Sequence, residues 1–148
     1  MRTVLLIIHI LAAGAWIGAS VTSGFLSARF RSDNVVGAAF MRAFEAMGRL
    51  LFNVAGIVVL ITGIWLVIVS DAWSFSDAFV SIGFLVVIVG ALLGIFGFVR
   101  LARRGVAAHE SANAAEIASV YARLRAFGTI DLVLLVVAVS AMVGKWGT

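Results

Sequence analysis

The sequence predicts an all-α protein: a transmembrane four-helix bundle with cytoplasmic helical extensions. Its residues are 64% hydrophobic and 12% charged, with a mean hydropathy of +1.19, whereas a soluble domain is about half apolar and about one quarter charged. The absence of cysteine excludes disulfides and thiolate metal sites. The net charge of +4 does not indicate a nucleic-acid partner, because the charges lie at the ends of apolar runs. The expected partner is the lipid bilayer.

Four apolar segments are long enough to cross a bilayer: residues 4–28, 50–70, 79–99 and 127–144. A span needs about 20 residues, and each span must be helical because lipid offers no partners to backbone polar groups. The first segment also imitates a secretory signal that ends in Ala-Gly-Ala, but we expect no cleavage and interpret it as a span. We therefore expect one integral membrane domain over residues 1–148.

The two long connections, residues 29–49 and 100–126, are expected to be helical as well. Asp33 or Asn34 can cap a helix that runs into the second span. Asn113 and Glu116 have capping-box spacing before the fourth span, and Gly105 is expected to break the helix after the third. These amphipathic extensions would lie on the inner leaflet, pack on each other below the bundle, or simply continue the spans with solvated arginine faces.

The basic residues predict an orientation. Nine arginines lie in residues 29–49 and 100–126, whereas only Arg2 and Lys145 lie on the opposite side. Since cytoplasmic loops are enriched in lysine and arginine, we expect both long connections inside and both termini outside. Three tryptophans fall at the outer boundary, where an aromatic belt is expected: Trp65, Trp73 and Trp146.

Small residues spaced four apart occur in the first and third spans: Gly14, Gly18, Gly90 and Gly94. Such residues allow helices in lipid to approach closely. We expect the first and third spans to meet at these glycines, either inside one bundle or across a homo-oligomer. The same glycines could serve a larger membrane complex.

A polar face in the first span carries the outer candidate site. Four polar or aromatic residues follow one another at helical spacing: His9, Trp16, Ser20 and Ser23. They share a face that should contact protein rather than lipid. Met142 and Trp65 lie at a matching depth. His9 is either a neutral imidazole hydrogen-bonded near the interface or a ligand of haem b or copper, with Met142 as a second ligand. The candidate cofactor-binding residues are His9, Met142, Trp16 and Trp65, with His9 as the metal ligand.

An inner polar cluster is expected around Asp131. This carboxylate lies near the cytoplasmic end of the fourth span, and Asn53 lies at a similar depth in the second. We expect Asp131 to pair with Asn53 and with an arginine, Arg49 or one of two in the last connection, and the pair to fix helix register. A proton or ion relay is the alternative.

Three stretches resemble a known family. "HILAAGAWIGAS" is similar to the first helix of the CopD-like copper-resistance membrane proteins, "RLLFNVAGIVVLITGIWLV" to their second helix and "AVSAMVGKWGT" to their C-terminus. The HemJ haem proteins share this layout. The resemblance implies a bacterial inner-membrane protein with haem or copper near His9, which matches the family's first-helix histidine. Lys145 matches its terminal lysine, but Trp146 stands where relatives have proline, and the further histidines of a copper importer are absent.

Three function classes follow from these observations. The first is a haem or copper protein with its cofactor at His9. The second is a carrier or channel for a small solute, which requires a continuous polar path from Asp131 to His9. The third is an accessory subunit of a membrane complex. No catalytic motif appears in the sequence: it has no P-loop, no HExxH and no paired carboxylates.

Overall fold

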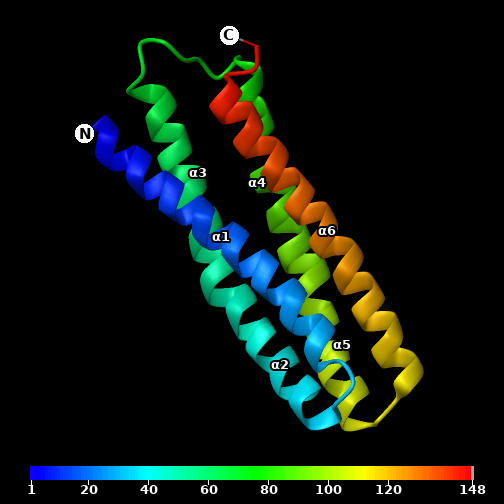
Figure 1. Ribbon diagram of the computed structural model, residues 1–148. Helices are drawn as coiled ribbons and strands as arrows, with labels where there is room; N and C mark the ends of the chain where they lie inside the picture. Colours follow the sequence, from blue (N-terminus) through cyan, green and yellow to red (C-terminus); the bar gives the residue numbers. More distant parts are fainter. Residues whose placement is uncertain (148) are drawn as a thin grey trace.

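The computed structural model describes residues 1–147 and shows an elongated bundle with both termini at one end (Figure 1). These residues form helices and no strand, which confirms the predicted all-α class. The first helix is α1 (Arg2–Phe30) and the last is α6 (Ala114–Gly144). Two composite helices stand between them, each with a short π-helical segment inside it. Their parts are α2 (Asn34–Met47), η1 (Gly48–Phe52) and α3 (Asn53–Ile68), then α4 (Ala78–Leu92), η2 (Leu93–Phe98) and α5 (Val99–Glu110).

The four helical segments are longer than the membrane requires. They contain 29, 35, 33 and 31 residues, and each is apolar enough to cross a bilayer. At about 1.5 Å per residue they are roughly 45–50 Å long, whereas the hydrocarbon core is about 30 Å thick. The ends that carry charged residues, α2 and α5 among them, therefore extend beyond the membrane. This confirms that the long connections are helical continuations of the spans.

Two side-chain caps fix where the extensions begin. Asp33 Oδ1 accepts from the backbone N–H groups of Val35 and Val36 at 2.9 Å, so Asp33, rather than Asn34, is the N-cap of α2. Asn113 accepts from the N–H of Glu116 at 3.1 Å and caps α6. Each cap satisfies donors that the first turn of a helix leaves unpaired.

The predicted helix break at Gly105 is wrong. Helix α5 continues through this residue to Glu110. A Cβ at Gly105 would lie 2.7 Å from Met41 Sδ, so the glycine permits close approach of α2 rather than a turn. The chain turns later, beside Ala112, which has a φ of 49°.

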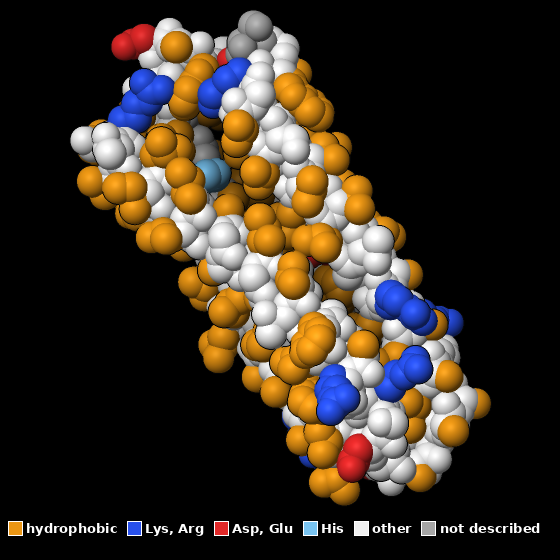
Figure 2. Space-filling model, viewed as in Figure 1, with side chains coloured by type: hydrophobic (Ala, Val, Ile, Leu, Met, Phe, Trp, Pro, Cys, Tyr) orange, Lys and Arg blue, Asp and Glu red, His pale blue; other side chains and the backbone are white. Residues whose placement is uncertain are grey.

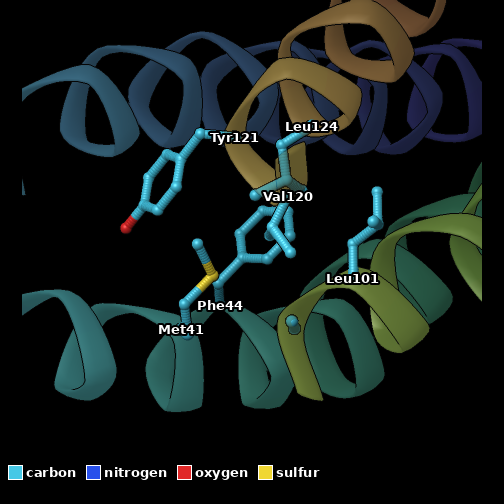
Figure 3. Packing of buried hydrophobic residues seen from close by; sticks show 7 residues of the cluster. Met41, Phe44, Leu101, Val120, Tyr121 and Leu124 are labelled. Carbon is cyan, nitrogen blue, oxygen red and sulfur yellow. The ribbon is translucent and has the colours of Figure 1, made fainter. Parts of the chain in front are cut away.

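The extensions pack on each other below the bundle, one of the arrangements considered from the sequence. Figure 3 shows Met41 and Phe44 of α2 directed toward Val120 of α6, with Leu101 of α5 beside them. Met41 and Val120 are completely buried. The largest fully buried side chains of the described residues lie in these extensions, so the interlocked extensions form a buried core of their own.

The expected contact between the first and third spans at their glycines is wrong within the chain. Helix α1 packs mainly against α3 and α6. A Cβ at Gly14, Gly18 or Gly94 would meet no atom within 4 Å. Gly90 instead receives the indole of Trp16, whose Cζ2 would lie 2.5 Å from an added Cβ. A role of the open glycines in contacts with another chain stays a prediction.

Candidate functional site

Helix α1 supplies the hydrogen-bond donors that contact Asp131 of α6. The carboxylate is 3% exposed and accepts a 2.7 Å hydrogen bond from Ser20 Oγ. Trp16, one helical turn away on the same face, also hydrogen-bonds Asp131, with its indole N–H as the donor. These two donors of α1 thus converge on one acceptor of α6.

The inner cluster expected around Asp131 therefore has different members. Asn53 is exposed, and Arg49 donates to Glu45 at 2.6 Å, so neither reaches Asp131. The pairing with an arginine was wrong because hydroxyl and indole donors on α1 lie closer to the carboxylate. Arginines at the ends of spans extend toward water, and Arg49 pairs with Glu45 there.

Asp131 lies at one end of a cleft between the second half of α1 and the first half of α6. This α1–α6 cleft has a volume of about 300 Å³, and its lining is mostly apolar. Ser20, Ser23 and Asp131 line its deep end, whereas Arg31 and Arg125 line the end toward the helical extensions. Figure 2 shows this face of the molecule, with hollows between the two helices and basic side chains gathered near the end opposite the chain termini. Four aromatic side chains from the remaining helices also line the cleft: Phe40, Phe44, Phe52 and Phe98.

Ser23 contributes an unsatisfied group to this cleft. The residue is 7% exposed, and its Oγ is the buried side-chain N or O atom in residues 1–147 that has no hydrogen-bond partner. A buried hydroxyl without a partner costs free energy. Ser23 was recognised from the sequence only as part of the polar face of the first span.

The outer site contains His9, which is 7% exposed. Its Nδ1 lies 2.8 Å from Thr62 Oγ1. Since the Thr62 hydroxyl donates to the Val58 carbonyl at 2.5 Å, it accepts from the Nδ1–H of His9, and Nε2 keeps its lone pair. Thr62 was missed from the sequence, although a lone threonine within the apolar second span was a signal of a polar partner.

A small cavity of about 40 Å³ adjoins His9. Met142 and Trp16 also line this cavity, so the structure brings three of the four predicted outer residues together. Trp65 is 48% exposed and does not line it. A volume of this size holds a water or a single ion, whereas pockets for organic ligands measure about 300–1,000 Å³. The cavity therefore does not fit a haem.

Trp16 stands between the two hollow regions. Its indole lines the small cavity beside His9 and hydrogen-bonds Asp131 of the cleft. The ring also packs against Gly56 of α3, 3.5 Å from an added Cβ. A polar path from Asp131 to His9 is therefore interrupted by an aromatic ring.

A cation–π cluster closes the end of the bundle that carries both chain termini. The Arg2 guanidinium lies 4.5 Å from the Trp73 ring centre and the Lys145 ammonium 4.0 Å from it. Lys145 also lies over Phe79. Burial lowers the pKa of Lys145, and the nearby charge of Arg2 lowers it further. Trp73 thereby links the start of the first helix with the end of the last helix.

His109 forms a second buried polar cluster in the helical extension α5. It is 2% exposed, and its ring nitrogens lie 3.1 Å from Tyr121 Oη and 3.3 Å from Asn34 Oδ1. Burial lowers the pKa of His109, and the charge of Asp33 opposes this effect in part. Burial also raises the pKa of Tyr121 to about 12. A neutral imidazole that accepts from Tyr121 and donates to Asn34 satisfies all three groups.

No group of three or more His, Asp or Glu side chains is placed to hold a metal ion in residues 1–147. A metal at His9 would thus depend on Met142 as its second protein ligand.

Four long apolar helices joined by a buried polar network define an integral membrane protein. The chain belongs to a family described as predicted integral membrane protein (DUF2269), whose match covers residues 3–146. Comparison with curated proteins and with solved structures finds no match.

Proposed function

We propose that this small polytopic membrane protein binds a single amphiphilic molecule in the α1–α6 cleft. The observation that carries the proposal is the cleft itself, about 300 Å³ of mostly apolar space with polar groups at its two ends. Ligand sites commonly combine apolar walls with a few placed polar groups. A molecule with a polar head and an apolar body matches this distribution.

The edge of the cleft favours a ligand that arrives from the bilayer. Val21 and Phe25 line this edge and are 52% and 71% exposed. Exposed apolar side chains at this depth face lipid, because no water is available there. An amphiphile could therefore enter sideways between α1 and α6 without leaving the membrane.

A variant that fills the cleft tests the proposal. A Cβ at Gly128 meets no atom within 4 Å, and Gly128 lines the cleft, so Gly128→Trp places its ring in open cleft space. Gly94→Trp is the matched control, because Gly94 is equally open but lies outside the cleft. The measurement is the amount of amphiphile retained per chain, by native mass spectrometry of full-length protein in mild detergent.

Wild type and Gly94→Trp should retain one amphiphile per chain, and Gly128→Trp should lose most of it. Equal retention in Gly128→Trp and wild type would show that the molecule binds elsewhere. A wild-type protein that carries no amphiphile, and takes up none from added lipid, would also contradict the proposal.

We further propose a bacterial inner-membrane location for one domain over residues 1–148, with both termini outside. The excess of arginine in the helical extensions supports this orientation. Because the chain lacks cysteine, single cysteines give a clean test with a membrane-impermeant maleimide. Ser76→Cys should react in intact cells, whereas Ser111→Cys should react only after lysis; the reverse pattern would invert the topology.

We propose Cu(I) binding at the outer cavity as a second candidate function. His9 and Met142 line one cavity, and imidazole and thioether both suit Cu(I). The resemblance to CopD-like proteins supports the same assignment. Protein loaded with Cu(I) under reducing conditions should hold copper that is lost in His9→Ala and in Met142→Leu, but kept in the control Met47→Leu. Copper retained in all three variants would exclude this site, and a Soret band that depends on His9 would point to haem instead.

A further inference from the structure

We infer that the α1–α6 cleft selects an anionic amphiphile of the phospholipid type, whose phosphate is bound by Arg31 and Arg125 and whose acyl ester oxygen accepts from Ser23. This inference rests on the proposed function and names its ligand class. Three observations support it: the charge balance at the cytoplasmic end, the positions of the two arginines on the cleft walls, and the unpaired hydroxyl at depth.

The cytoplasmic end of the bundle carries more positive charge than its own carboxylates can neutralise. Nine arginines lie there, against four acidic residues. Three glutamates are already engaged with arginines other than those of the cleft, and Asp33 caps α2. The ion pairs are Arg42–Glu110, Arg49–Glu45, Arg103–Glu45 and Arg104–Glu116.

Arg31 and Arg125 are the two arginines that line the cleft. Both are exposed, and neither forms an ion pair with a carboxylate among the described residues. A guanidinium binds phosphate oxygens with strong, directed hydrogen bonds. Basic side chains at the cytoplasmic surface also attract anionic lipids. The mouth of the cleft is therefore complementary in charge to an anionic ligand.

The depth of the cleft matches an extended molecule. Arg31, the C-cap residue of α1, follows Ser23 by eight residues, which corresponds to about 12 Å along the helix axis. Arg125 precedes Asp131 by six residues on α6, about 9 Å. Both walls thus place their basic residue toward the cytoplasm and their polar residues deeper, with phenylalanine side chains among the lining. A head group would lie at the arginines while the body extends toward Ser23.

Ser23 indicates which chemical group of the ligand lies deep in the cleft. Its hydroxyl is buried and unpaired, whereas the neighbouring Ser20 and Asp131 already satisfy each other. A hydroxyl without an acceptor can donate to a carbonyl oxygen. The ester carbonyl of an acyl chain supplies that oxygen, and an ether-linked chain does not.

The head-group part is tested by titrating full-length protein in detergent with dioleoylphosphatidylglycerol and with dioleoylphosphatidylcholine, using native mass spectrometry. Wild type should bind phosphatidylglycerol at least tenfold more tightly. The double variant Arg31→Gln/Arg125→Gln should weaken phosphatidylglycerol binding about 25-fold, near fivefold per arginine. It should weaken phosphatidylcholine binding by a clearly smaller factor, because the choline cation opposes the contact of that lipid's phosphate with the arginines. The matched control is Arg29→Gln/Arg123→Gln, two exposed arginines outside the cleft lining, which should change either affinity less than twofold.

The Ser23 part is tested with ester-linked and ether-linked phosphatidylglycerol. Ser23→Ala should weaken binding of the ester lipid about threefold and leave binding of the ether lipid unchanged. An equal effect on both lipids would show that Ser23 does not bind the ester carbonyl.

The outcomes separate this inference from the proposed function. If both lipids bind equally and both are lost in Gly128→Trp, the cleft still binds an amphiphile but does not select an anion, and the inference fails alone. If inorganic phosphate at millimolar concentration displaces phosphatidylglycerol completely, the arginines bind a free anion and the lipid assignment is wrong. If Gly128→Trp binds like wild type, the proposed function fails as well.

Discussion

At the scale of single residues, the buried polar groups of the membrane region work in pairs that join different helices. Asp131 of α6 accepts from Ser20 and Trp16 of α1, and His9 of α1 donates to Thr62 of α3. Since polar groups in lipid are costly unless paired, these contacts specify which helices α1 can lie against.

The Asp131 network should respond differently to two substitutions. Asp131→Ala leaves the Ser20 hydroxyl and the Trp16 indole without an acceptor, so the free energy of unfolding should fall by about 1–3 kcal/mol. Asp131→Asn keeps an acceptor oxygen and should cost less than half as much. Unfolding of the purified protein in mixed micelles measures both. Equal losses in the two variants would show that the carboxylate charge, rather than hydrogen bonding, holds the network.

His9 and Thr62 should be energetically coupled. A double-mutant cycle of His9→Ala and Thr62→Val should give a coupling free energy of about 0.5–1.5 kcal/mol, the range found for polar pairs between membrane helices. The same micelle unfolding assay supplies the four stabilities. Strict additivity would mean that the 2.8 Å contact contributes nothing to folding.

His109 should make stability depend on pH. Burial lowers its pKa below the ordinary value of 6.5, so at acid pH the unfolded chain binds a proton that the folded chain resists. Its stabilising contribution is complete above pH 6.5 and is lost as the pH falls from there toward the lowered pKa. The melting temperature should therefore drop between pH 7.5 and pH 5.5, and His109→Gln should reduce that drop. An identical pH dependence in wild type and variant would contradict the buried neutral imidazole.

The sequence identified several of these residues but not their partners. His9, Trp16, Ser20 and Asp131 could be recognised because polar side chains are conspicuous in apolar spans. Thr62 and the Ser20–Asp131 bond could not be predicted, since partner choice depends on how each helix is rotated about its axis. Spans that are apolar on all sides carry little information about that rotation.

At the scale of helices, the packing of one aromatic side chain fixes the position of α1 in the bundle. Trp16 packs against Gly56 of α3 and Gly90 of α4, where a Cβ would collide with the ring or touch it. The spacing of the glycines was visible in the sequence, but it suggested backbone contact between two helices. Gly90 instead makes room for a side chain, because the bulk of tryptophan fills the space that separates α1 from α4.

Gly90 and Gly94 should therefore differ sharply when substituted. Gly90→Leu forces the Trp16 ring to move and should lower the free energy of unfolding by about 1–3 kcal/mol. Gly94→Leu meets open space and should leave stability nearly unchanged. The tryptophan fluorescence of the folded protein should shift in the first variant and remain constant in the second. Equal effects would place Trp16 elsewhere.

The helical elements themselves were largely predictable. The four spans and the helical extensions follow from the lengths of apolar runs and from the caps at Asp33 and Asn113. The prediction of a helix break at Gly105 was wrong because a glycine in a helix can mark close packing as well as a turn. Only the tertiary contact with Met41 distinguishes the two.

At the scale of the whole molecule, the bundle is closed at both ends and open along one side. The extensions interlock at one end, and the cluster around Trp73 closes the end that carries the chain termini. Between them, α1 and α6 diverge enough to leave the cleft. The fold could be predicted from composition and periodicity, whereas the cleft could not, because it arises from the relative placement of helices that are far apart in sequence.

The central claim is that this cleft holds an anionic amphiphile, and an experimental structure of the protein in nanodiscs that contain phosphatidylglycerol tests it most directly. We expect elongated density between Arg31 and Ser23, with the head group at the two cleft arginines, and no such density in Gly128→Trp. A wild-type cleft that is empty, or in which α1 and α6 close onto each other in lipid, would contradict the claim.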